Sequence, residues 1–90
     1  MTLIEAVKQL AELDGDCTIY ARSPWASSTE AKLAVEGSDE EKKAKSEGLG
    51  YFLEVSIARE FLDDWRLTQK KPPTVEQSCA RLVEYATNEA

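Results

Sequence analysis

Carboxylates are the most numerous side chains in this sequence that could do chemistry. Asp and Glu together number 17, whereas histidine is absent. Histidine is the commonest general base at neutral pH and the commonest zinc ligand, so its absence removes most hydrolase schemes and most zinc sites. Asp63 and Asp64 are neighbours on a predicted helix, where they point about 100° apart and cannot share one substrate. No catalytic residue is expected, and an enzyme that uses carboxylates with Tyr20 or Tyr51 ranks last among the functions considered.

Neither the cysteines nor the glycines match a known cofactor site. Cys17 and Cys79 lack the Cys-x-x-Cys spacing of zinc and redox sites, and the chain has no histidine to activate a thiol. Two small buried thiols are therefore expected in preference to a disulfide. Gly48 and Gly50 lack the third glycine of a dinucleotide fingerprint and precede a predicted strand instead of following one. No cofactor is expected.

Acidic residues gather in two stretches that offer contacts to a basic partner. The first stretch crowds the C-terminal end of the first predicted helix, and the second opens a charged segment in the middle of the chain. Together they consist of Glu12, Asp14, Asp16, Asp39, Glu40 and Glu41. A metal site is not expected at the first stretch, because Thr18 and Tyr20 stand where the ligands of a calcium loop would have to continue. The plainer alternative for this stretch is turn formation, since Asp-Gly is a favoured turn dipeptide.

Trp25 is the other candidate contact for a partner. It follows Pro24 in a loop after a predicted strand. An exposed Trp25 with Tyr20 and Arg22 nearby would resemble the hot spot of a protein interface. The alternative, in which Trp25 closes the edge of the core, fits the sequence equally well. Trp65 differs, because it lies on the apolar face of a predicted helix and is expected in the core.

The overall charge indicates the kind of partner. The 90-residue chain has a formal net charge of -6 and no basic stripe. Nucleic acids and anionic membranes bind surfaces with clustered Lys and Arg, so neither is expected as a direct partner, whereas a basic protein would be attracted. No apolar run approaches the roughly 20 residues needed to cross a bilayer, and no secretion signal opens the chain. We therefore expect one cytoplasmic domain over residues 1–90.

A strand that runs directly into a helix is the central unit of the predicted fold. The hydrophobic period changes from two to about three and a half within residues 50–65. The strand positions are Tyr51, Leu53 and Val55, and the helix positions are Ala58, Phe61, Leu62 and Trp65. Ser56 is the expected N-cap of this helix. Arg59 and Arg66 are spaced to pair with neighbouring acids such as Asp63.

Capping boxes mark the starts of two further helices. Thr2 with Glu5 opens the first helix, which Gly15 is expected to end in a left-handed conformation. Thr74 opens the last helix after a break at two prolines. The apolar face of this last helix consists of Val75, Cys79, Leu82, Val83 and Ala86.

The middle of the chain supplies two strands and a charged segment. Residues 17–22 alternate as a half-buried strand that stops before Pro24. Residues 27–37 fit either a short strand or a helix, and we choose a strand because residues 17–22 need an antiparallel partner. Residues 40–47 have no apolar face, which predicts a short solvated helix or a mobile loop. The elements together predict a small α+β domain, in which helices cover an antiparallel three-stranded sheet.

The pattern of the chain resembles a group of small uncharacterised bacterial proteins. The resemblance rests on the Thr-Ile-Tyr-Ala strand at residues 18–21, the Pro-Trp loop at 24–25 and the strand-to-helix run at 51–62. It implies no catalytic residue and no substrate. In being short, acidic and without cofactor motifs, the chain is also similar to toxin-immunity proteins, although a likeness of this kind does not define a role.

We therefore expect a non-enzymatic acidic module, immunity-like or inhibitory, that neutralises a basic protein through complementary charge. The partner would be a toxin with a basic nucleic-acid-binding cleft or another nucleic-acid-handling protein. The expected contacts are the two acidic stretches together with Tyr20 and Trp25. The alternative from another class is an oligomeric structural or regulatory adaptor, in which an edge strand pairs with a second copy.

Overall fold

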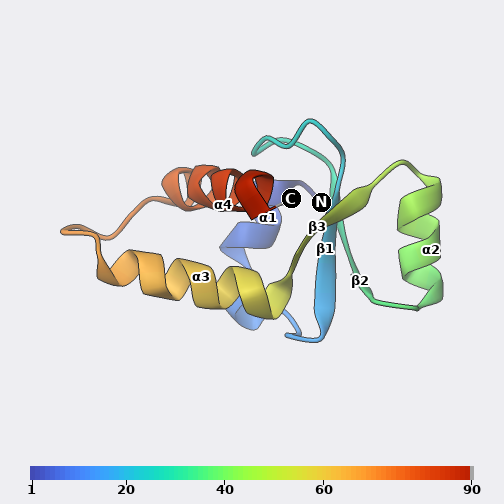
Figure 1. The fold of residues 1–90 in the computed structure, drawn as a ribbon, viewed down its shortest axis with the longest axis horizontal. Helices are drawn as coiled ribbons and strands as arrows, with labels where there is room; N and C mark the ends of the chain where they lie inside the picture. Colours follow the sequence, from blue (N-terminus) through green and yellow to red (C-terminus); the bar gives the residue numbers. More distant parts are fainter. Residues whose placement is uncertain (90) are drawn as a thin grey trace.

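A three-stranded antiparallel sheet separates two unequal layers of helix (Figure 1). The computed structural model describes residues 1–89. The strands are β1 (Cys17–Ala21), β2 (Ala31–Val35) and β3 (Gly50–Glu54), in the spatial order β2-β1-β3. The helices are α1 (Leu3–Lys8), α2 (Asp39–Ser46), α3 (Val55–Leu67) and α4 (Val75–Glu89). Helices α1, α3 and α4 cover one face of the sheet and α2 covers the other, which confirms the predicted α+β class and order of elements.

The strand predicted within residues 27–37 is confirmed as β2. It pairs antiparallel with β1 in a register that runs from Cys17 opposite Val35 to Ala21 opposite Ala31. The N-terminal residues extend the outer side of β2 by a single bridge between Thr2 and Glu30. β2 is therefore an edge strand whose beginning is covered by the start of the chain.

A β-bulge in β3 overturns the predicted alternation of this strand. Leu53 pairs with Ile19 and Tyr51 pairs with Tyr20, so that Phe52 is an extra residue between two ladder positions. The bulge lets the adjacent side chains of Phe52 and Leu53 both reach the core, whereas Tyr51 is 51% exposed. A period of two would instead have placed Tyr51 on the buried face with Leu53.

The helices begin largely as predicted, with one exception at the start of α3. The capping box of Thr2 and Glu5 is present at α1, and at α4 the Thr74 N–H donates to the Gln77 side chain at 2.8 Å. Ser56 is not an N-cap, because α3 already begins at Val55 and no side chain caps it.

The first helix also ends differently from the prediction. α1 stops at Lys8 and a 3-10 turn over Leu10–Glu12 follows. Gly15 does not end it, because positive φ angles occur only at Gly37 and Gly48 within the described residues. The chain is turned instead by Asp14, whose side chain accepts the Asp16 N–H at 2.9 Å.

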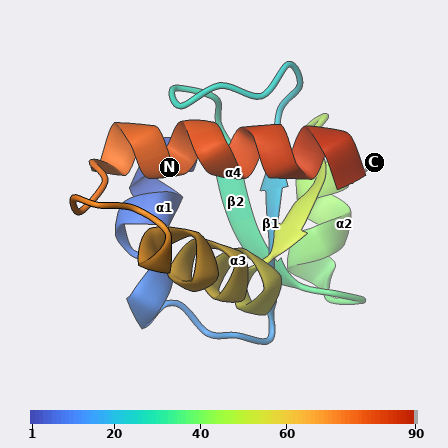
Figure 2. The same ribbon diagram turned by 60° about the vertical axis from the view of Figure 1, so that its left-hand side comes forward.

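The main core lies between the sheet and the layer of helices α1, α3 and α4. Figure 2 shows these three helices lying across one face of the strands. Its buried members include Leu3, Ile19, Phe52, Leu62, Cys79 and Leu82. Phe61 of α3 and Tyr85 of α4 stack with their ring centroids 4.0 Å apart, which ties these two helices together. Trp65 packs against the core and remains partly exposed, and both cysteines are free thiols, Cys79 buried and Cys17 half-buried. Among residues 1–89, no helix has the length and apolar character needed to cross a membrane.

A second, smaller core lies beneath α2. Its buried members are Tyr20, Ala34, Ala44 and Leu49. The prediction that residues 40–47 lack a packed face is therefore wrong, because the single alanine of this charged helix is fully buried against the sheet. The side chains of β1 are covered on both faces, so the prediction of a half-buried strand is wrong as well. An alternating pattern in a strand predicts that one face of the sheet is buried. It gives no sign that a second helix covers the other face when that helix, like α2, is mostly charged.

Candidate binding surface at the acidic end of the sheet

The ends of all three strands bring acidic side chains from separate parts of the sequence together. Asp14 and Asp16 immediately precede β1, Glu36 follows β2, and Glu54 ends β3 opposite Thr18. α2 begins at the same end, because its N-cap Ser38 donates its N–H to the carbonyl of Val35 at 3.1 Å. We call this surface the acidic end of the sheet. It consists of Glu12, Asp14, Asp16, Glu36, Asp39, Glu40 and Glu54.

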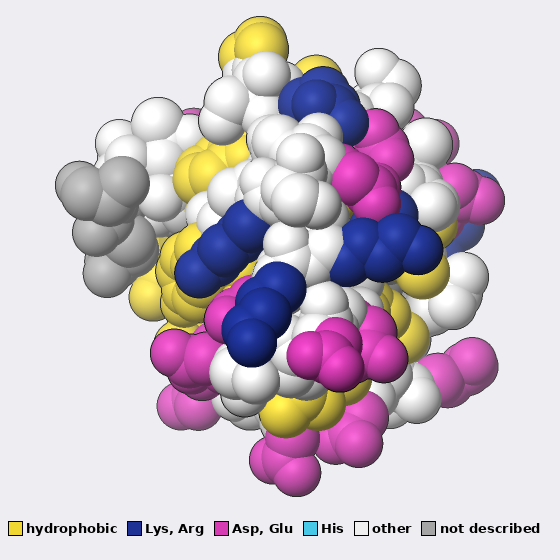
Figure 3. Space-filling model, turned by 90° about the vertical axis from the view of Figure 1, so that its right-hand side faces the viewer, with side chains coloured by type: hydrophobic (Ala, Val, Ile, Leu, Met, Phe, Trp, Pro, Cys, Tyr) yellow, Lys and Arg dark blue, Asp and Glu magenta, His cyan; other side chains and the backbone are white. Residues whose placement is uncertain are grey.

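The fold thus joins the two acidic stretches that the sequence separates. None of the carboxylates of the acidic end forms an ion pair within residues 1–89. Seen from the side of α2, Asp and Glu gather at the lower part of the molecule and Lys and Arg in its middle (Figure 3). The helix α2 follows the same polarity, with Asp39, Glu40 and Glu41 in its first turn and Lys43 and Lys45 in its last, which suits its dipole.

The electrostatic effect of the acidic end is visible in two neighbouring groups. Burial raises the pKa of the Cys17 thiol, and the charges of Asp14 and Asp16 raise it further. Burial likewise raises the pKa of Tyr51, and the negative charge of Glu54 raises it further. A thiol with a raised pKa is a weaker nucleophile at neutral pH, so Cys17 is not activated for nucleophilic chemistry at this surface.

Asp14 has a structural task in addition to its charge. Its carboxylate accepts the Asp16 N–H, and its carbonyl accepts the Cys17 N–H at 3.1 Å. The turn interpretation of this stretch therefore holds for Asp14. Glu12 and Asp16 are exposed, and their carboxylates form no ion pair within residues 1–89.

Arg59 of α3 stabilises the connection between α1 and β1 by hydrogen bonds to its backbone. Its guanidinium donates to the carbonyl of Leu10 from Nε at 3.2 Å and from Nη2 at 2.9 Å, and it also donates to the carbonyl of Leu13. The predicted pairing of Arg59 with Asp63 is therefore wrong, whereas Arg66 does pair with Asp63 at 3.4 Å. A cation at these carbonyls offsets the unfavourable placement of acids near the end of a helix.

Tyr20 is not part of an exposed contact surface, so this part of the prediction is wrong. Its side chain is 2% exposed, and its hydroxyl donates to the Glu41 carboxylate at 2.5 Å. Glu41 also accepts the Gly37 N–H at 3.2 Å, and its side chain is only 13% exposed. The two residues attach α2 to β1, and neither presents its polar group to a partner.

Trp25 closes the edge of the core, which was the alternative left open by the sequence. Its ring meets Phe52 edge to face, with centroids 4.9 Å apart. Because it follows β1, whereas the acidic stretches precede β1 and follow β2, Trp25 lies at the other end of the sheet. The sequence-predicted contacts are therefore not one surface: the acids come together, and Trp25 stands apart.

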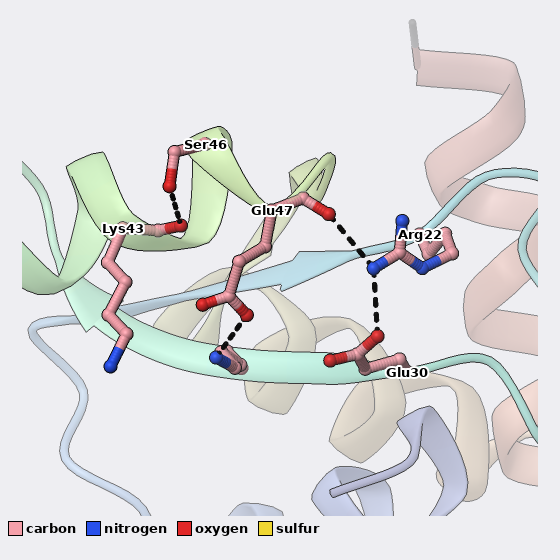
Figure 4. A network of polar contacts seen from close by, with 6 residues as sticks. Arg22, Glu30, Lys43, Ser46 and Glu47 are labelled. Atoms are coloured by element: carbon pink, nitrogen blue, oxygen red, sulfur yellow. Dashed lines mark hydrogen bonds and ion pairs between the residues drawn. The ribbon is translucent and has the colours of Figure 1, made fainter.

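A network of ion pairs at the other end of the sheet was not predicted (Figure 4). Arg22 donates from Nη2 to the Glu30 carboxylate and to the carbonyl of Glu47, both at 2.9 Å. The Glu47 carboxylate in turn accepts from Lys32 at 2.5 Å. Gly48 allows this arrangement, because its φ is +87° and a Cβ there would stand 2.9 Å from Arg22 Nη1. The network anchors the C-terminal end of α2, as Tyr20 anchors its N-terminal end.

Four surface hollows in the described part of the chain have volumes from about 160 to about 590 Å³, and none of these four is lined by two carboxylates. Within the described residues, no three side chains of His, Cys, Asp or Glu gather in a geometry that could hold a metal ion.

The contact between Tyr20 and Glu41 predicts how stability depends on pH. Burial, together with the hydrogen bond to Glu41, raises the pKa of Tyr20 from 10.0 to about 12. A raised pKa in the folded state means that this contribution is complete below pH 10 and is lost as the pH rises toward 12. We expect chemical denaturation at a series of alkaline pH values to show this loss in the native sequence and a smaller loss in Tyr20→Phe. An equal loss in both proteins would contradict the assignment.

Comparisons of the chain with protein-family models, with curated proteins and with solved structures found no match.

Proposed function

We propose that this chain is a non-enzymatic binding module that uses the acidic end of its sheet to hold a basic protein. The observation that carries the proposal is the convergence of unpaired carboxylates from three strand ends and the first turn of α2. Complementary charge of this kind accelerates association and selects among partners. Because the carboxylates lie on or beside strands, they are held in a fixed arrangement before the partner arrives, which lowers the entropy cost of binding.

The partner class follows from the sign of the surface. A toxin with a basic nucleic-acid-binding cleft, or another nucleic-acid-handling protein, presents clustered Lys and Arg that match a carboxylate surface. The acidic module would cover that cleft in place of nucleic acid, as an inhibitor or an immunity-like protein. We place the chain in the cytoplasm, which agrees with its two free thiols.

Removing charge from the acidic end is expected to weaken binding of a basic partner. The triple variant Glu12→Gln, Asp16→Asn and Asp39→Asn removes exposed carboxylates and leaves Asp14 to form its turn. With a partner captured from the native host, we expect the association rate constant to fall about tenfold and its salt dependence to weaken. Surface plasmon resonance at low and high salt measures both effects.

A matched variant separates the acidic end from net charge alone. Glu60→Gln, Asp64→Asn and Glu76→Gln also remove three exposed carboxylates, from α3 and α4, and Glu76 occupies the first turn of its helix as Asp39 does. We expect this control to bind like the native protein. If the association rate constant fell equally in the two triple variants, or did not depend on salt concentration in the native protein, the proposed surface would be refuted.

A further inference from the structure

The outer edge of β2 has free backbone groups. The Arg22 N–H donates to the Glu30 carbonyl at 3.0 Å, so the even-numbered residues of β2 face β1 and the odd-numbered residues turn their N–H and C=O outward. Of these outward groups, the Ala31 N–H is taken by the Met1 carbonyl at 2.8 Å. The N–H and C=O of Leu33 and the N–H of Val35 have no partner within residues 1–89. An edge of this kind is a template for another strand.

Two apolar side chains along this edge are about half exposed. Val35 is 49% exposed and Met1 is 48% exposed. A hollow of about 350 Å³ lies beside the strand and is lined by Met1, Ala31, Lys32, Leu33, Glu40 and Lys43. Glu36, at the end of the strand, is exposed and forms no ion pair within the described residues.

We propose that the free edge of β2 pairs antiparallel with β2 of a second copy of this chain, with Ala34 at the twofold axis. Leu33 then lies opposite Val35 of the other copy, and Lys32 lies opposite Glu36 of the other copy. The Leu33 carbonyl accepts the Val35 N–H across the axis. The opposite Val35 carbonyl already accepts the N–H and the hydroxyl of Ser38, so the bond from the Val35 N–H to the Leu33 carbonyl, made twice across the axis, is the one that joins the strands. The two sheets become continuous.

The structure selects this register over its neighbours. Met1 already lies opposite Ala31, so a pair centred on Leu33 would place the second copy's Val35 where Met1 is. A pair centred on Val35 would need residue 37 in the strand, but Gly37 has a φ of +84° and turns the chain away. Only the pair centred on Ala34 fills the open positions without meeting either obstacle.

Charge and side-chain character fit the same register. Lys32 and Glu36 are opposite in sign and meet twice across the axis, and such directly opposed pairs stabilise antiparallel strands. On the other face of the sheet, Leu33 meets Val35, an apolar pair that covers a half-exposed valine. The Lys32 side chain is 37% exposed, so its ammonium can face a second carboxylate while it keeps its ion pair with Glu47. This pairing goes beyond the binding of a basic partner and does not depend on it.

Charge reversal tests the register directly. Lys32→Glu and Glu36→Lys each place like charges opposite one another twice, and we expect the dimer dissociation constant to rise about tenfold or more. Mixing the two variants makes every pair across the axis opposite in sign again, so a heterodimer is expected. Analytical ultracentrifugation over a range of concentrations measures each case. Lys42→Glu and Glu60→Lys reverse exposed charges that neither lie on β2 nor line the hollow beside it, and they are expected to leave the dimer unchanged.

Several outcomes would overturn the proposal. The native chain could remain a monomer at all concentrations, either reversal could leave the dimer intact, or two folded variants could fail to associate when mixed. Circular dichroism establishes that the variants are folded. Val35→Lys provides a second route, because it places a charge on the edge without disturbing Lys32 or Glu47, and we expect it to be monomeric. A Val35→Lys chain that dimerises like the native protein would also refute the pairing.

Discussion

Replacing Phe52 by alanine is expected to lower the free energy of unfolding by about 3 to 5 kcal/mol. Phe52 is 2% exposed and meets the Trp25 ring edge to face, so its loss leaves a cavity and removes the support of the Trp25 loop. Urea denaturation followed by circular dichroism measures the change. We also expect the fluorescence of Trp25 to shift, because its ring loses its main aromatic contact.

The adjacent Tyr51 provides the matched control for Phe52. It is an aromatic residue on the same strand but is 51% exposed. Tyr51→Ala is expected to change stability by no more than about 1 kcal/mol. If the two losses were equal, the bulge that turns Phe52 inward and Tyr51 outward would be in doubt.

Replacing Arg59 by methionine is the second change with a large expected effect, about 2 to 4 kcal/mol. Methionine keeps an apolar stem but removes the guanidinium that serves the carbonyls of Leu10 and Leu13. Those carbonyls would lose a charged donor at the turn that leads into the acidic end. Thermal and urea denaturation measure the loss, and Arg59→Lys should recover only part of it because lysine lacks the planar fork.

Arg66→Met is the control for this prediction. Arg66 lies on the same helix and pairs with Asp63, and the side chains of both are well exposed, 44% and 65%. Exposed pairs contribute little, so we expect a change within about 0.5 kcal/mol. Comparable losses at Arg59 and Arg66 would mean that the carbonyl contacts do not stabilise the connection.

Local signals in the sequence predicted the fold class well. The side chains of Thr2 and Thr74 mark helix starts through contacts with residues three positions later. The change of hydrophobic period near residue 55 places a strand before a helix. Both signals depend only on residues that are close in the sequence, so they can be recognised without a structure. An isolated strand is unstable, so residues 17–22 need a partner and the sequence favours a strand over a helix within residues 27–37; the pairing of β2 with β1 confirms this prediction.

Features that depend on distant contacts could not be predicted. The bulge at Phe52 is set by the fit of β3 against β1, and the docking of α2 depends on one alanine and on a bond between Tyr20 and Glu41, which lie 21 residues apart. Arg59 reaches carbonyls 46 and 49 residues away. The two acidic stretches were recognised individually, but their convergence follows from strand register, which no local pattern specifies.

The path of the chain through the sheet has a consequence for the order of folding. β2 and β3 both run antiparallel to β1, so they are parallel to each other, and α2 carries the chain from one edge to the other across a face of the sheet. The β1–β2 hairpin closes a short loop between Ala21 and Ala31, whereas pairing Thr18 with Glu54 encloses a much longer one. Because loop closure costs more entropy as the loop lengthens, we expect the hairpin to form early and β3 to pair with β1 last. Until β3 pairs, the backbone groups on one side of β1 are exposed, and the chain is most vulnerable to aggregation during this interval.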